Sequence, residues 1–143
     1  MLHLQVSADI EAAIEAVVLF LGAFDLIADF HPQIAACQTD GDEVGATRRL
    51  WLSDGQEISE VLTELAHNGY SYRSTAPSHG MVRWEGRIEV EADGEHSRVK
   101  WSLDFEPTDD ADPDRIAEST RGLFEEGLAS AKRQLEGLTD HGV

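Results

Sequence analysis

The sequence predicts one α+β domain over residues 1–143, with a curved antiparallel sheet of about seven strands around a long C-terminal helix. Between residues 34 and 105, short apolar-polar alternations are separated by turn pairs such as Asp54-Gly55 and Asn68-Gly69, which is typical of a meander. From Ala111 to Leu138, apolar residues recur every three or four positions, which predicts an amphipathic helix. Such a helix buries its apolar face against the sheet that precedes it. A strongly curved sheet would leave a hollow beneath it, and we expect function there.

The N-terminal segment predicts one strand and two short helices. The strand is expected at Leu2–Val6, followed by a helix that runs to about Leu21, with Ser7 or Asp9 as its N-cap. A second helix is expected at Asp25–Asp29, just before a His-Pro pair.

Six further strands complete the predicted sheet. They are expected at Ile34–Thr39, Thr47–Leu52, Glu57–Leu65, Gly69–Ser74, Val82–Glu91 and Ser97–Phe105. Because side chains alternate across a strand, the inward face can be assigned in the last two. The predicted inward residues are Val82, Trp84, Gly86, Ile88, Val90, Val99, Trp101, Leu103 and Phe105.

An inward arginine is the most unusual consequence of this alternation. Arg48 shares a strand face with Leu50 and Leu52, so if the leucines point inward, Arg48 does too. An unpaired buried charge is costly, so Arg48 requires an acidic or ligand partner.

The charge and composition of the chain argue against nucleic-acid binding and membrane insertion. The chain carries 28 acidic and 11 basic side chains, a formal net charge of −17, which would repel nucleic acid and anionic membranes. No stretch approaches 18 consecutive apolar residues, so membrane insertion is not expected, and the N-terminus lacks the basic region of a secretory signal. The single cysteine, Cys37, cannot form an internal disulfide and favours a cytoplasmic location. A homodimer is left open.

No catalytic, metal or cofactor motif is present. The six histidines show no HxxxH or HExxH spacing, and no nucleophile elbow, phosphate loop or dinucleotide fingerprint occurs. We therefore predict no metal and no cofactor.

Several segments nevertheless resemble a known family. They are Gly22–Phe24, Leu26–Ile34, Gly41–Arg48, Asp54–Glu60, Tyr70–Arg73, Ser97–Trp101 and Gly122–Leu128. With the order of elements, they make the chain similar to the helix-grip fold of the START/Bet v 1-like superfamily. The resemblance is strongest to the polyketide cyclase/dehydrase-like group, which also resembles the plant abscisic acid receptors. It covers nearly the whole chain, but Val18 and Phe30 stand where tryptophan is usual, and Ala76–Gly80 departs from the usual Pro-Leu-Pro loop.

The resemblance implies a cavity whose lining can be named residue by residue. It puts His31 where the hormone receptors have a cationic group that meets a ligand carboxylate, and Glu60 where they have an inward glutamate that organises water. The candidate ligand-binding residues are His31, Arg48, Glu60, Tyr72, Trp84, Trp101, Phe124 and Leu128. Structural roles remain open as well. His31 would then hydrogen-bond the end of a helix, Arg48 and Glu60 would form a bridge between strands, and the tryptophans would be core residues.

The expected function is binding of a small hydrophobic or amphipathic ligand, such as a lipid, an aromatic or a polyketide-like compound, between the sheet and the last helix. The alternative is a polyketide aromatase/cyclase or dehydratase that uses His31, Arg48, Glu60 and Tyr72 as acid and base groups. A second alternative is a protein-interaction module that uses the acidic surface.

Overall fold

The computed structural model describes the main chain of residues 1–141 and the side chains of residues 1–137. In chain order, its elements are β1 (Leu2–Ile10), α1 (Ile14–Leu21), α2 (Ile27–Phe30), β2 (Ile34–Thr39), β3 (Thr47–Leu52), β4 (Glu57–Ala66), β5 (Gly69–Ser74), β6 (Met81–Asp93), β7 (His96–Pro107) and α3 (Pro113–His141). Within this part of the chain, no helix is both long and apolar enough to cross a membrane.

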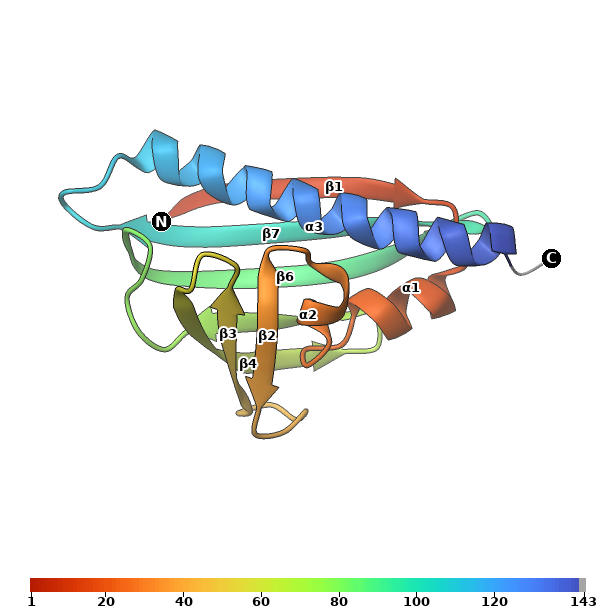
Figure 1. Ribbon diagram of the computed structural model, residues 1–143, viewed down its shortest axis with the longest axis horizontal. Coiled ribbons are helices and arrows are strands. Elements are labelled where there is room, and N and C mark those ends of the chain that lie inside the picture. The colour runs from red at the N-terminus through yellow and green to blue at the C-terminus, as the bar shows by residue number, and fades with distance from the viewer. Residues whose placement is uncertain (142–143) are drawn as a thin grey trace.

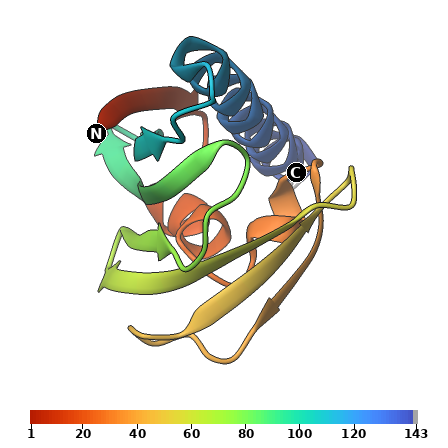
Figure 2. The ribbon, with the colours of Figure 1, turned by 90° about the vertical axis from the view of Figure 1, so that its left-hand side faces the viewer.

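The strands form one antiparallel sheet in the order β1-β7-β6-β5-β4-β3-β2. Strands β2 to β7 are a simple meander, and β1 joins the sheet by pairing with β7. In Figure 1, α3 runs alongside β1 and β7, while Figure 2 shows the strands curving around the space that the helices border. The helix-grip fold expected from the sequence is confirmed.

The N-terminal elements differ from the expectation. β1 continues to Ile10, and α1 begins only at Ile14. Ser7 and Asp9, expected as helix N-caps, are strand residues that pair with Lys100 and Arg98 of β7. Pairing along the whole edge of β7 outweighs the local preference of serine and aspartate for a cap. The second helix, α2, begins two residues later than expected.

The prediction that Val82 points inward is wrong. A register irregularity between Met81 and Arg83 interrupts the alternation of β6. Met81 therefore takes the buried position, and Val82 is 41% exposed. Beyond this point the alternation resumes, and Trp84, Gly86 and Ile88 are buried as expected.

Helix α3 begins with a capped turn and packs unevenly along its length. The Asp112 carboxylate accepts the main-chain N–H of Asp114 at 3.1 Å, and Pro113 occupies the first helical position. Between residues 113 and 123 no side chain is buried, whereas Phe124, Leu128, Ala131 and Leu135 belong to the core. Leu138, expected to continue the apolar stripe, lies outside the residues whose side chains are described.

Candidate functional site

A cavity of about 840 Å³ lies between the sheet and the less buried half of α3. Its apolar lining comes from several elements and includes Ile27, Ile34, Leu50, Leu52, Ile58, Met81, Leu103, Ile116 and Leu123. Exposed polar side chains also border it, namely Ser53, Asp54, Gln56, Arg115, Ser119 and Glu126. A concave, mostly apolar space of this size is typical of a binding site for a small molecule.

Seven of the eight candidate residues line this cavity. They are His31, Arg48, Glu60, Tyr72, Trp84, Trp101 and Phe124. Leu128 does not line it, because it lies one turn further along α3, where the helix is in contact with the core, and it is only 1% exposed.

Arg48 is fully buried, and four of its five N–H groups donate hydrogen bonds to protein acceptors. It stands directly opposite Glu60 in the pairing of β3 with β4, so the register puts both side chains on the inward face. Its Nε and Nη2 donate to one carboxylate oxygen of Glu60 at 3.0 and 2.8 Å. Its Nη1 donates to the main-chain oxygen of Phe24 at 2.8 Å and to the Tyr70 hydroxyl at 3.1 Å. The inward arginine thus has a partner for each of its three nitrogens.

The surroundings of Arg48 favour its charged form. Burial alone would lower the pKa of Arg48, but Tyr70, Glu60 and Tyr72 outweigh it and the pKa lies above its ordinary value. The second carboxylate oxygen of Glu60 accepts the indole N–H of Trp84 at 2.6 Å. Both oxygens of Glu60 are therefore bound by protein donors, one by Arg48 of the neighbouring strand and the other by Trp84.

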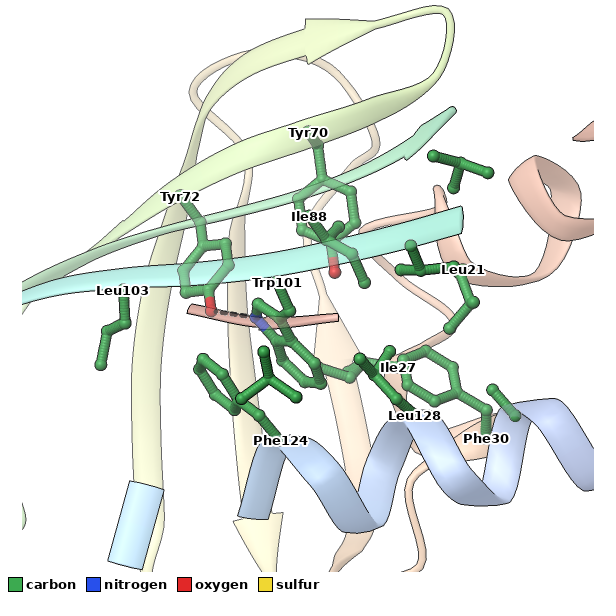
Figure 3. Packing of buried hydrophobic residues seen from close by; sticks show 14 of the residues in the cluster. Leu21, Ile27, Phe30, Tyr70, Tyr72, Ile88, Trp101, Leu103, Phe124 and Leu128 are labelled. Carbon is green, nitrogen blue, oxygen red and sulfur yellow. Dashed lines mark hydrogen bonds between the residues drawn. The ribbon is translucent and has the colours of Figure 1, made fainter. Parts of the chain in front are cut away.

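The Tyr72 hydroxyl has an acceptor role in the structure, and within residues 1–137 its own hydrogen has no acceptor. Its oxygen accepts the indole N–H of Trp101 at 2.9 Å (Figure 3). Because an indole N–H can only donate, the hydrogen of Tyr72 is left over, and no acceptor for it occurs among the described residues. Burial, followed by the charge of Glu60, raises the pKa of Tyr72, so the phenol stays protonated.

A glycine makes room for this tyrosine. Gly86 of β6 pairs with Tyr72 of β5, and the phenol ring lies over the position that a side chain would occupy. A β-carbon at residue 86 would lie only 2.1 Å from Cζ of Tyr72. Gly86 was assigned to the inward face from the sequence, but its role in seating the tyrosine was not visible there.

His31 is held by main-chain groups and is 1% exposed. Its Nδ1 accepts the N–H of Gln33 at 3.1 Å, which leaves Nε2 to donate to the main-chain oxygen of Leu123 in α3 at 2.8 Å. Burial lowers the pKa of His31 and favours the neutral ring. His31 therefore bonds to the middle of α3 and not to the end of a helix, and main-chain groups occupy both of its ring nitrogens.

The ring of His31 approaches α3 closely because residue 127 is glycine. A β-carbon at Gly127 would lie 2.5 Å from Cδ2 of His31. On the same side, Trp101 stacks on Phe124 with ring centroids 4.0 Å apart and planes 7° apart. Figure 3 shows these two rings next to each other at α3, and both residues line the cavity.

Three features of the site were missed from the sequence. Tyr70 lies two residues before Tyr72, so the alternation that turns one inward also turns the other inward, and this signal was present. The main-chain oxygens of Phe24 and Leu123 carry no sequence signal at all. His79, treated only as one of several scattered histidines, also lines the cavity. The described residues contain no group of three or more histidine, cysteine or acidic side chains placed to hold a metal ion.

The chain matches a known protein family over most of its length. Residues 1–136 match the model of a family described as polyketide cyclase/dehydrase and lipid transport. No significant match was found among proteins with curated functions.

Solved structures show the same fold. The protein XoxI from Bacillus cereus is 25% identical, with a TM-score of 0.88 over 97% of this chain and 99% of its own. A START superfamily protein from Mycobacterium smegmatis is 14% identical, with a TM-score of 0.78 over 95% and 98% of the two chains. Ara h 8.0201 is 13% identical, with a TM-score of 0.74 over 95% and 98%.

Family and fold together indicate a domain that binds hydrophobic ligands. The family match extends over almost the entire chain, and the structural matches cover nearly all of both partners. The chain therefore belongs to the polyketide cyclase/dehydrase and lipid transport family, and it shares its fold with a START superfamily protein and with Ara h 8.0201.

Proposed function

We propose that the protein binds a small hydrophobic or amphipathic molecule, such as a lipid, an aromatic or a polyketide-like compound, in the cavity beneath α3. The observation that supports this most directly is a cavity of about 840 Å³ with a largely apolar lining, in which the two buried charges are already paired with each other. Transfer of an apolar ligand from water into such a space is favourable by about 25 cal/mol for each Å² buried. Because Arg48 and Glu60 are mutually satisfied, the ligand need not supply a counter-charge.

The direct test is native mass spectrometry of protein purified from its host, combined with a thermal-shift screen of hydrophobic acids, alcohols and aromatic compounds. A ligand present at 100 times its Kd should stabilise the fold by about 2.7 kcal/mol. A co-purified mass or a concentration-dependent shift supports the proposal. The absence of both in every chemical class would contradict it.

A matched pair of helix variants localises any binding to the cavity. Gly122 lines the cavity and has open space around it, and Gly137 has open space on the same helix outside the cavity. Gly122→Trp should reduce the ligand-induced thermal shift, because the indole competes for the cavity. Gly137→Trp should leave the shift unchanged.

The contacts are less favourable for the enzymatic alternative. A cyclase or dehydratase requires a free acid and a free base. Protein groups already occupy both nitrogens of His31, both oxygens of Glu60 and all three nitrogens of Arg48. Among the described residues, the hydrogens of these four groups that lack an acceptor are the hydroxyl hydrogen of Tyr72 and one N–H of Arg48. The pKa of each is raised, so both groups stay protonated and neither can act as a base.

Two expectations from the sequence stay predictions. The acidic interaction module predicts a basic partner and binding that weakens with salt, which pull-downs at low ionic strength would detect. The cytoplasmic location rests on the single cysteine, Cys37, which the structure shows as free.

A further inference from the structure

The turn between β5 and β6 contains an unusual histidine. Residues Ser78 to Met81 close a two-residue hairpin turn through two main-chain hydrogen bonds, of 3.1 and 2.9 Å. Both central residues have positive φ, +55° at His79 and +77° at Gly80. Turns of this kind favour Asn-Gly, because asparagine and glycine adopt positive φ most readily. The demands of the turn alone would therefore be met better by asparagine than by histidine.

This turn is fixed against the beginning of α3. The N–H of Thr108 donates to the main-chain oxygen of Gly80 at 2.8 Å. Gly80 also faces α3 so closely that a β-carbon there would lie 3.1 Å from Cδ1 of Ile116. His79 is thus held at the end of the cavity where α3 begins, and its side chain is part of the lining.

One nitrogen of the His79 imidazole is hydrogen-bonded, and the other has no hydrogen-bond partner among the described residues. Nδ1 lies 2.5 Å from Oγ of Ser78, which fixes the orientation of the ring. Nε2 is buried and, among the described residues, is the one buried side-chain nitrogen or oxygen without a hydrogen-bond partner. Buried polar atoms nearly always have a partner, so an orphan in the wall of a cavity indicates that the partner comes from the cavity.

We propose that His79 determines ligand specificity, with Nε2 hydrogen-bonded to a hydroxyl or carbonyl oxygen of the bound molecule. This inference rests on the proposed function and adds to it the chemistry of one end of the ligand. The Ser78 hydroxyl can either donate to Nδ1 or accept from it, so Nε2 is available as a donor or as an acceptor. The apolar remainder of the ligand would lie along the rest of the cavity.

The test uses pairs of probes that differ only in a hydroxyl replaced by a methyl group: 2-naphthol with 2-methylnaphthalene, and 4-phenylphenol with 4-methylbiphenyl. Isothermal titration calorimetry gives the ratio of the two Kd values in each pair. The ratios are compared between the unmodified protein, His79→Asn and His79→Gln. Asparagine can replace Nδ1 but does not reach the position of Nε2, whereas the amide nitrogen of glutamine does.

In at least one pair, His79→Asn should reduce the preference for the hydroxyl probe by about threefold to tenfold, the usual net effect of one hydrogen bond. His79→Gln should retain most of that preference. The asparagine variant should keep or raise its melting temperature, since Asn-Gly suits the turn. A lower affinity without a change in the ratio would mean damage to the cavity and not loss of a hydrogen bond, and would overturn the proposal.

Failure of the two proposals is distinguishable. If both probes of a pair bind but their ratio is unchanged in His79→Asn, water alone satisfies Nε2, and the role of His79 is overturned while ligand binding stands. If the unmodified protein binds none of the four probes and shows no thermal shift with any compound class, the proposed function is wrong and the role of His79 falls with it.

Discussion

The two halves of α3 have the same apolar periodicity, but only one of them is buried in the core. Both carry apolar residues at helical spacing, yet the half from Phe124 onwards is embedded in the core and residues 113–123 bury no side chain. The packed half contacts His31 and Trp101 closely. The open half forms one wall of the cavity. A helical stripe therefore predicts that a helix will face a sheet, but not how closely it approaches.

Because of this difference, substitutions in the two halves of α3 should affect different properties of the protein. Substitutions in the packed half should act on stability, because protein interiors are close-packed and relax little. Substitutions in the open half should act mainly on ligand binding. The Arg48–Glu60 pair belongs to the sheet and lines the cavity, but its two charges are buried and paired with each other, so it should behave as part of the packed region.

The largest expected effect is that of Arg48→Ala. Removing one member of a buried pair leaves the other charge uncompensated, and the free energy of unfolding should fall by about 3–5 kcal/mol. The neighbouring arginine is a matched control, because Arg49 pairs with Glu57 at 2.6 Å but its side chain is 57% exposed. Arg49→Ala should cost less than about 1 kcal/mol. Equal losses in urea unfolding would show that the buried pair is not structural.

A direct comparison of the two halves uses one aliphatic residue from each. Leu128→Ala should lower the free energy of unfolding by about 2–5 kcal/mol, because it empties a fully packed site. Ile116→Ala should cost clearly less, since Ile116 is only partly buried and borders the cavity, but it should change probe affinity. Chemical denaturation and probe titration of both variants check this. A larger loss of stability for Ile116→Ala would reverse the assignment of the two halves.

The glycines of α3 sharpen the contrast. Gly127→Ala should destabilise by about 1–3 kcal/mol, because its β-carbon would collide with His31 and disturb the bond to Leu123. A β-carbon at Gly122 would have no atom within 4 Å. Gly122→Ala should therefore raise the free energy of unfolding by about 0.5–1 kcal/mol through helix propensity alone. Thermal unfolding should therefore shift in opposite directions. A stabilising Gly127→Ala would mean that His31 can move away at little cost.

The smallest expected effect is a pH dependence from His31. Its pKa in the fold is lowered from 6.5 by burial, so the unfolded chain binds a proton more readily than the native protein. The contribution of His31 to stability should be complete above about pH 6.5 and decrease as the pH falls through the window below that value. Glu126 lies nearby and opposes the shift. The slope of stability against pH in this window should flatten in His31→Gln but not in the control His67→Gln, which alters an exposed histidine.

Much of the fold could be predicted from the sequence because turn-forming residues mark where several strands begin and end. Strands β2, β3 and β5 have the predicted bounds, since turn residues stand at their ends. β1 was predicted too short, because Ser7 and Asp9 look like helix caps unless their partners in β7, about 90 residues later in the chain, are known. The bulge that exposes Val82 likewise depends on the pairing of β6 with β7.

Only those residues of the candidate site whose direction follows from strand alternation could be predicted from the sequence. Alternation placed Arg48, Trp84 and Trp101 on the inward face, and the structure brings all three to the cavity. The orphan nitrogen of His79 depends on the conformation of a turn, and the contact of His31 depends on a main-chain oxygen of a distant helix. Neither leaves a periodic signal in the sequence.

The pairing of β1 with β7 has a consequence for the order of folding. Leu2 pairs with Phe105 and Ile10 with Ser97, so the partner of β1 is synthesised only about 90 residues after β1 itself. Strands β2 to β7 each pair with a neighbour in sequence, and short loops close at a smaller entropic cost than long ones. We expect the meander to form first and β1 to dock late, with its apolar residues Leu4, Val6 and Ile10 uncovered until then. During synthesis, we therefore expect these apolar residues to be exposed to non-native contacts until β7 has been made.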